Sequence, residues 1–313
     1  MANYRRKKKS NALLKVILSL LALLSVTLGC IYLSGEPIED FIGQFINFET
    51  QSPSIPAINP EGKEMAVHFI DVGQGDSTLF QTPNGSVLVD CGESEYGEDV
   101  VAYLKAQGVE ELEYFIITHP DSDHMGCAAY ILENIKVKMF VMNGQEKSTK
   151  FFSKALDVIE EKQIPVDVVV PGDVITVGAL QLKIYGPKAH IIETDEWNDA
   201  SLIIHATYGS RSFLLTGDAE KLGEESLLEN YTNELKCDVF SAGHHGSKTS
   251  NSVELLSFAK PTYVVISCGE GNSHGHPHQE VLDRFEDIGA IVYRTDELGS
   301  IVFVTDGDTL TKK

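Results

Sequence analysis

The seven residues "THPDSDH", Thr118 to His124, hold two histidines and two aspartates within six positions. Such a density of ionisable side chains is costly to bury unless the groups are paired or bind a metal. Histidine nitrogens and carboxylate oxygens are ligands for borderline divalent metals, and the stretch follows the apolar run "YFII". It therefore predicts a metal-binding loop at the end of a buried strand.

Polar residues also end other apolar runs of the chain. Asp90 follows "SVLV", Asp218 follows "FLLTG", and His244 follows "CDVFSAG". A pocket at one edge of stacked sheets would gather all of these side chains. A solvated acidic loop with chance histidines is the alternative explanation of "HPDSDH". The downstream motifs "TGD" and "HHGS" argue against it.

The spacing of apolar runs predicts the architecture. Short strand-like runs occur in hairpins, separated by amphipathic stretches, rather than in a regular alternation with helices. This order predicts two mixed sheets packed face to face with helices outside. The helical patterns cover residues 99–107, 127–134, 150–163, 226–232, 252–258 and 278–288.

Six motifs in a fixed order resemble those of the metallo-β-lactamase superfamily. They are "DVGQGDS" (71–77), "LVDCG" (88–92), "THPDSDHMGC" (118–127), "NDAS" (198–201), "LLTGD" (214–218) and "AGHHGSKTS" (242–250). The set looks most like the ComEC-type branch and covers Met65 to Asp306. The resemblance implies an αββα sandwich with a dinuclear hydrolase site.

The resemblance also implies a ligand set for two divalent metal ions, either zinc or manganese. The residues carried over are His119 and Asp121 for the first ion, Asp123, His124 and His244 for the second, and Asp218 as the bridge. His245 is the alternative to His244. The superfamily's remaining histidine has no counterpart, and Asn198 stands near its place, so the oxygen-rich first site favours manganese or another hard ion. Trp197, the sole tryptophan, either lines the substrate cleft beside Asn198 or packs.

Other residues are expected to support the site without binding metal. Asp90 is expected to orient a ligand histidine or the metal loop, and Asn198 to stand near the first ion. The turn "GQGD" presents Gln74 and Asp76 toward the site. Two further roles are expected in catalysis. His276 of "GHPH" would donate a proton to the leaving group or hold a phosphoryl oxygen, and Lys248 would stabilise the transition state.

The N-terminal region predicts export and membrane attachment. Residues 1–12 form a basic cytoplasmic tail, 13–33 a transmembrane anchor or signal, 34–63 a linker with four prolines, and 64–313 the hydrolase domain. Because positive charge stays inside, the domain is expected outside the cell, on a single-pass membrane protein. A lipoprotein, through "TLGC", or a secreted protein is the alternative.

Charge and motifs together limit the function. Beyond residue 33 the chain carries 19 basic and 46 acidic residues, a net charge of −27, which opposes tight binding of long DNA. The expected activity is that of a phosphodiesterase or nuclease using a metal-bound hydroxide, on DNA or a cell-wall phosphoester. The alternatives are a surface binding module with a degenerate metal site, or a hydrolase of another ester or thioester. β-Lactam hydrolysis is disfavoured by Asp121.

Overall fold

The computed structural model describes residues 57, 58, 60, 62–194 and 196–313. The expected tail, the membrane segment and most of the linker lie outside these residues, so their boundaries stay predictions. Within the part that is described, no helix is both long enough and apolar enough to cross a membrane.

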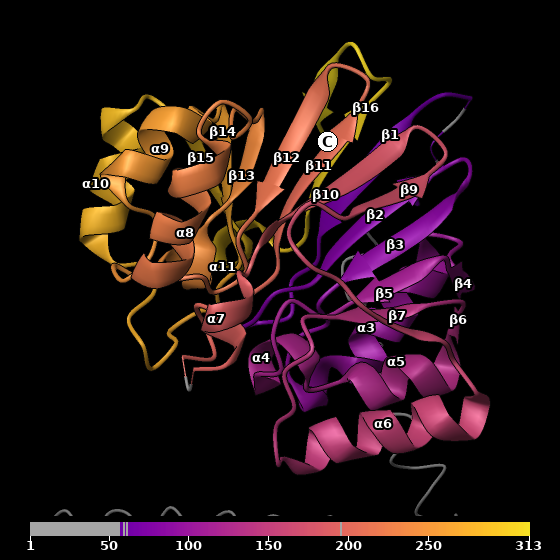
Figure 1. The fold of residues 1–313 in the computed structure, drawn as a ribbon. Helices are drawn as coiled ribbons and strands as arrows, with labels where there is room; N and C mark the ends of the chain where they lie inside the picture. The colour runs from indigo at the N-terminus through magenta and orange to yellow at the C-terminus, as the bar shows by residue number, and fades with distance from the viewer. Residues whose placement is uncertain (1–56, 59, 61, 195) are drawn as a thin grey trace, which may run out of the picture. The chain divides into compact units, whose positions relative to one another are not determined.

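Two mixed sheets form the centre of the described unit (Figure 1). The first sheet contains, in spatial order, β17 (Leu310–Lys312), β16 (Ile301–Thr305), β1 (Met65–Phe69), β2 (Thr78–Thr82), β3 (Gly85–Val89), β5 (Tyr114–Ile116), β7 (Phe140–Met142) and β8 (Val166–Val168). The second contains β15 (Ile291–Arg294), β14 (Tyr263–Ile266), β13 (Val239–Ser241), β12 (Arg211–Leu215), β11 (Ile203–Tyr208), β10 (Leu180–Gly186) and β9 (Val174–Val177). A small separate sheet pairs β4 (Glu111–Leu112) with β6 (Lys136–Val137).

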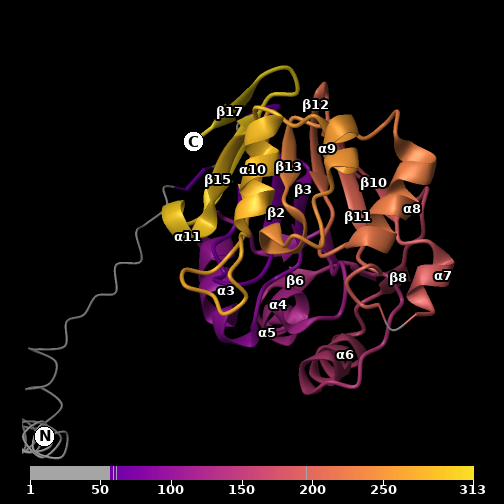
Figure 2. The same cartoon turned by 90° about the vertical axis from the view of Figure 1, so that its left-hand side faces the viewer.

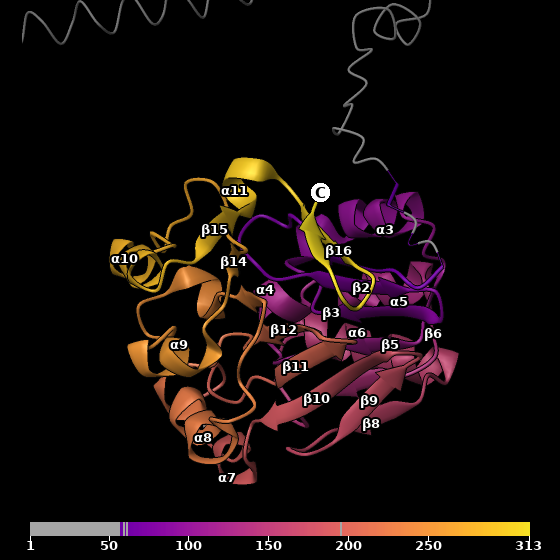
Figure 3. The same cartoon turned by 90° about the horizontal axis from the view of Figure 1, so that it is seen from above.

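Helices cover the outer face of each sheet (Figures 2 and 3). One apolar cluster joins the first sheet to η1 (Ser94–Tyr96), α3 (Gly97–Ala106), α4 (Ser122–Met125), α5 (Ala128–Asn134) and α6 (Lys150–Lys162). Another joins the second sheet to α8 (Lys221–Tyr231), α9 (Val253–Ala259) and α10 (Gln279–Asp287). The remaining short helices are α7 (Ala189–Ile192), η2 (Gly243–Gly246) and α11 (Thr295–Leu298).

The main core lies between the two sheets. Phe80 of β2 and Phe213 of β12 meet there edge to face, with ring centroids 6.1 Å apart. Fully buried aromatic pairs of this kind stabilise packing beyond their buried area. The layers therefore run helix, sheet, sheet, helix, and the prediction of two mixed sheets with outer helices is confirmed.

Each sheet has a parallel half, and these halves position the polar residues. Strands β3, β5, β7 and β8 are parallel, as are β12, β13, β14 and β15. Carboxyl ends of parallel strands lie at the same edge of a sheet, where ligands usually bind. Asp90 follows β3, His119 follows β5, Asp218 follows β12 and His244 follows β13. The fold thus brings four separated motifs to one edge.

Several elements differ from the pattern that the apolar runs predict, among them the strands β4, β6, β8, β9 and β17 and the start of α8. The edge strands β8 and β9 were not anticipated, and Val166 and Val168 of β8 are 45% and 51% exposed. Asp, Pro and Gly interrupt this valine-rich stretch as turn signals, and the strand geometry comes from pairing with β7 and β10. Helix α8 begins at Lys221 rather than at residue 226.

Candidate metal centre

Asp218 lies at the centre of the site. It follows β12 and is 2% exposed. Its Oδ1 atom is 3.1 Å from His124 Nε2 and 3.6 Å from His245 Nε2. Its Oδ2 atom is 4.0 Å from His119 Nε2 and 3.6 Å from His244 Nε2. Each carboxylate oxygen therefore faces two histidine nitrogens, as a group bridging two ions requires.

The Oδ1 half of the site is the more compact one. Asp123 Oδ2 lies 3.2 Å from His245 Nε2. One ligand atom from each of Asp123, His124, Asp218 and His245 lies within 4.8 Å of the others. The resemblance assigned His244 to this half and kept His245 as the alternative. In the structure, His245 is the histidine that lies beside Asp123 and His124.

The Oδ2 half combines His119 and His244 and opens toward solvent. Asp121, expected here, has a side chain that is 28% exposed, and its Oδ1 atom is 2.5 Å from Lys147 Nζ. Asp121 is therefore at the mouth of the site, paired with an ammonium group. The sequence pattern offered only His119, Asp121 and the bridging Asp218 for this half. In the structure, His244 also lies in it.

Asp90 orients His124 and the start of the metal loop. Its backbone has φ 57°, in the left-handed region that few non-glycine residues adopt, and the residue is 1% exposed. The backbone N–H and hydroxyl of Thr118 donate to its two oxygens at 2.8 and 2.7 Å. His124 Nδ1 donates to Asp90 Oδ2 at 2.9 Å, so Nε2 faces Asp218. The expected orienting role matches this geometry.

The rings of His119 and His245 also have a hydrogen-bond partner at Nδ1. His119 Nδ1 lies 3.2 Å from Ser201 Oγ, which accepts the Asp218 backbone N–H at 3.0 Å. His245 Nδ1 donates to the Ser267 carbonyl at 3.0 Å. In each case the hydrogen bond at Nδ1 leaves Nε2 directed at Asp218.

His244 is held from behind by a short chain of polar contacts. Glu220 Oε1 lies 3.0 Å from His244 Nδ1. Asn198 Nδ2 donates to the same oxygen at 3.4 Å. Asn198, expected to support the site without binding metal, thus contacts His244 through Glu220.

The buried polar atoms of the site are suited to a divalent metal. His119 Nε2, His124 Nε2 and Asp218 Oδ1 are buried without a hydrogen-bond partner. Buried polar atoms are otherwise almost always hydrogen-bonded, and imidazole nitrogens with carboxylate oxygens suit zinc, manganese or iron. The residues present therefore fit a metal centre.

Opposite charges within the site shift the pKa values of its buried groups. Burial alone would raise the pKa of Asp218, but the neighbouring His124 and His245 hold this pKa well below its ordinary value. Burial alone would lower the pKa of His124, but the Asp218 and Asp90 carboxylates raise it well above its ordinary value. Strong carboxylate–imidazole coupling of this kind is typical of functional sites.

The loop that presents His244 and His245 is strained and clamped. The two residues have φ 51° and 54°, which costs about 1–3 kcal/mol each in such regions. Asn251 holds the loop, because its side chain accepts the Gly243 N–H at 2.9 Å and donates to the Gly243 carbonyl at 2.9 Å. The clamp directs the two successive rings to opposite oxygens of Asp218.

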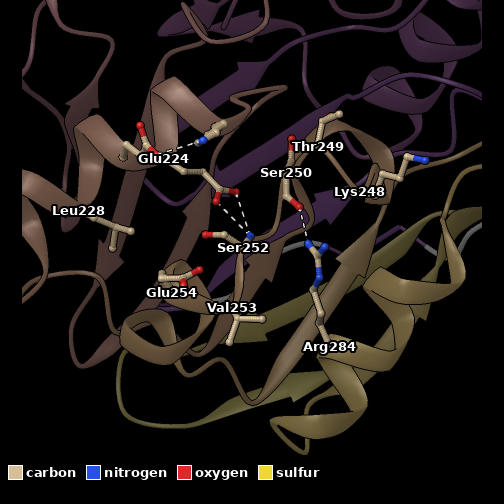
Figure 4. Close-up of a pocket in the computed structure, with 11 residues that line it drawn as sticks. Glu224, Leu228, Lys248, Thr249, Ser250, Ser252, Val253, Glu254 and Arg284 are labelled. Atoms are coloured by element: carbon tan, nitrogen blue, oxygen red, sulfur yellow. Dashed lines mark hydrogen bonds and ion pairs between the residues drawn. The ribbon is translucent and has the colours of Figure 1, made fainter.

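Behind this loop lies a pocket of about 530 Å³, shown in Figure 4. Buried Glu224 accepts the backbone N–H groups of Asn251 and Ser252, and Arg284 donates to the Ser250 and Asn251 carbonyls. These contacts support the histidine loop. Lys248 is exposed on the pocket wall, so its expected catalytic role stays a prediction.

The two outer loops expected near the site also reach it. His276 is 9% exposed, and its ring centroid is 5.4 Å from that of His244. Burial and the nearby histidines lower the pKa of His276 to about 4, so its ring is neutral at pH 7. Asp76 Oδ1 lies 3.5 Å from His245 Nδ1, whereas Gln74 accepts the Gly269 N–H at 3.2 Å. Gln74 therefore ties two loops together.

Glycine is required at position 75 of the "GQGD" turn. The backbone there has φ 157°, and a Cβ atom would lie 2.4 Å from the Asp123 carbonyl oxygen. The close approach allows the Asp76 N–H to donate to that carbonyl at 3.1 Å. The turn thus packs against the backbone of the metal loop.

Sequence reasoning missed three residues that contact the expected ligands. These are Glu220 beside His244, Lys147 beside Asp121 and Ser201 beside His119. Glu220 and Ser201 carried a signal, since one follows Asp218 by two positions and the other ends "NDAS". Lys147 lies in the loop after β7 and had no motif to mark it.

The fold and the arrangement of the site are those of the metallo-β-lactamase superfamily, and the sequence comparison agrees. Residues 70–270 match the model of the metallo-beta-lactamase superfamily. The chain therefore belongs to this superfamily.

Its curated relatives are ComEC-type competence proteins. ComE operon protein 3 of Bacillus subtilis is 35% identical over 266 residues, covering 79% of this chain and 34% of that protein. Recombination protein 2 of Haemophilus influenzae is 32% identical over 244 residues, covering 75% and 28%. The chain thus spans about a third of the length of the relatives it matches.

Two solved structures share the fold at low sequence identity. YhfI of Bacillus subtilis has a TM-score of 0.52 at 14% identity, covering 77% of this chain and 100% of that one. CmlA of Streptomyces venezuelae, a diiron beta-hydroxylase, has a TM-score of 0.50 at 13% identity, covering 75% and 53%. The fold therefore accommodates more than one metal chemistry, and the function must be argued from the residues of the site.

Proposed function

We propose that this protein is a dinuclear metal-dependent phosphodiesterase. The observation that carries the proposal is the approach of four histidine nitrogens to the two oxygens of one buried carboxylate, Asp218. A pair of divalent ions a few ångströms apart suits in-line displacement at phosphorus. The ComEC-type relatives, which include a competence and a recombination protein, support a nucleic-acid phosphodiester as substrate.

The ligands divide into two sets around Asp218. His119, Asp121 and His244 would hold one ion, and Asp123, His124 and His245 the other. When bound, the ions supply Lewis-acid activation of water and stabilise charge on the phosphoryl oxygens. Asp90 and Glu220 hold the rings of His124 and His244 in place through hydrogen bonds to Nδ1. The neutral ring of His276 offers an N–H to a phosphoryl oxygen, and the exposed Lys248 is proposed to supply positive charge from the wall of the pocket behind the histidine loop.

The site also argues against the alternative of an inactive binding module. A degenerate site would have lost ligands, yet here the missing superfamily histidine is matched by His244 on the same side of Asp218. The donor set combines imidazole nitrogens with carboxylate oxygens, which suits zinc as well as manganese. Hydrolysis of another ester or of a thioester is the competing activity. Assays on both kinds of substrate distinguish it from phosphodiester cleavage.

We expect the purified full-length protein to cleave bis-p-nitrophenyl phosphate in a metal-dependent reaction that manganese stimulates. Nitrocefin should be hydrolysed little or not at all, because Asp121 stands at the second position of the metal motif, as in the ComEC-type branch. Release of p-nitrophenol is the measurement, and protein stripped with EDTA is the control. Rapid thioester or lactam hydrolysis without any phosphoester cleavage by metal-loaded protein would overturn the proposal.

We further propose that residues 13–33 anchor the protein and that the hydrolase domain faces outward. The basic block before an apolar stretch of bilayer length supports this topology. Protease added to intact cells should then remove the domain from residue 64 onward, whereas a cytoplasmic marker protein stays intact. A domain that survives this treatment but is digested after lysis would contradict the topology.

A further inference from the structure

Lys147 and Trp197 form a pair beside the open half of the metal centre that the metal chemistry does not require. Lys147 Nζ lies 5.0 Å from the centroid of the Trp197 ring and 2.5 Å from Asp121 Oδ1. The ammonium group therefore contacts both an aromatic face and a carboxylate at the mouth of the site. Both the Lys147 side chain, 25% exposed, and the partly buried Trp197 are within reach of a ligand.

The two loops that carry the pair are joined by buried polar groups. Asn143 and Gln145 are 1% and 4% exposed. Asn143 Nδ2 donates to the Ala200 carbonyl at 2.7 Å and to Gln145 Oε1 at 2.9 Å. The loop of Lys147 is thus fixed to the loop of Trp197. Buried hydrogen bonds of this kind hold a binding surface in one geometry.

The loop of Trp197 is also connected to the metal ligands. Asn198, the next residue, hydrogen-bonds to Glu220, which in turn holds His244. The indole ring is therefore positioned relative to the same half of the centre as Asp121. A group attached to a phosphate at this half would extend toward the pair.

We propose that Lys147 and Trp197 select the substituent of the scissile phosphodiester, favouring a flat aromatic group such as a nucleobase over a cationic headgroup. This inference rests on the proposed phosphodiesterase function and names its substrate class. Base–aromatic stacking contributes about 1–3 kcal/mol per base, and the lysine ammonium has two donors beyond the one used by Asp121. The base stacks on the indole face that Lys147 does not cover, while the phosphate accepts a hydrogen bond from Lys147.

The same geometry disfavours a choline-type substituent. A quaternary ammonium binds aromatic faces through cation–π attraction. Here the Trp197 face already has a cation over it, and a second positive charge would be repelled by Lys147. The acidic surface of the protein attracts cations at long range. Discrimination against a cationic substituent therefore has to come from the repulsion by Lys147 at the site itself.

Trp197 itself provides the test, because it is the only tryptophan of the chain. Full-length metal-loaded protein is mixed with the dinucleoside monophosphate thymidylyl-thymidine or with glycerophosphocholine, and tryptophan emission is recorded before appreciable turnover. We expect the dinucleotide alone to quench the emission saturably. Lys147→Gln should weaken its affinity by about tenfold, the loss expected for one charge-assisted hydrogen bond. Lys154→Gln removes an exposed lysine of α6 that is paired with Glu133 of α5. This change should leave the affinity for the dinucleotide unchanged.

The outcomes separate this inference from the proposed function. Quenching by glycerophosphocholine but not by the dinucleotide would overturn the inference. So would an unchanged emission with both ligands in a protein that cleaves bis-p-nitrophenyl phosphate, although the phosphodiesterase proposal would then stand. Dinucleotide quenching that depends on Lys147, in a protein that cleaves no diester when metal-loaded, would support the binding site and overturn the activity.

Discussion

Replacing Asp218 by alanine is expected to remove both metal ions and abolish turnover. Its two oxygens each face two histidine nitrogens, and among the described residues no other side chain shares this position between the two halves. Loss of one group that stabilises transition-state charge already costs about 10²–10³-fold in kcat, and loss of both ions should exceed this. Metal content after dialysis, measured by mass spectrometry, and the rate on bis-p-nitrophenyl phosphate are the readouts.

A matched carboxylate variant controls for general loss of folding. Asp238 binds Arg211 at 3.1 Å and the Ser212 N–H at 2.9 Å, and it takes no part in the metal cluster. Asp238→Ala should lower the melting temperature yet keep the metal content of the unmodified protein. If Asp218→Ala retained both ions and its activity, the assignment of Asp218 as the bridge would be wrong.

The second large effect concerns the adjacent histidines, which are expected to serve different ions. His244→Ala and His245→Ala should each remove about one metal equivalent, since the two rings face opposite oxygens of Asp218. Either change should also lower kcat by about 10²-fold or more, because both ions stabilise the transferred phosphoryl group. For manganese-loaded protein, the spin-coupled spectrum of a dinuclear centre should give way to that of a single ion.

Double variants with Asp121→Asn identify which ion each histidine holds. Asp121 and His244 are assigned to the same half, so the variant that combines their changes should still bind the ion at Asp123 and His124. Combining Asp121→Asn with His245→Ala weakens both halves and should leave little metal. Equal metal content in the two double variants would contradict the division of the histidine pair.

The helix and strand pattern predicted most of the architecture, and the physical reason is local. Apolar runs of strand length and amphipathic helical stretches specify which face of each element is buried, and that determines the layers. The edge strands β8 and β9 escaped prediction because turn-forming Asp, Pro and Gly residues interrupt their stretch of sequence and because they expose several valines. Their strand geometry is imposed by a neighbour rather than by their own residues.

The motifs of the sequence predict the candidate donors of the site and the orienting role of Asp90. Most of these motifs follow a strand, so their place at the sheet edge follows from chain order. Which histidine of "HHGS" lies in which half follows only from the fold. That choice depends on two successive left-handed residues, held by Asn251 and supported through Glu224 and Arg284. The contacts of Lys147 with Trp197 and Asp121 also follow only from the fold. Contacts between distant loops arise from packing and leave no periodic pattern in the sequence.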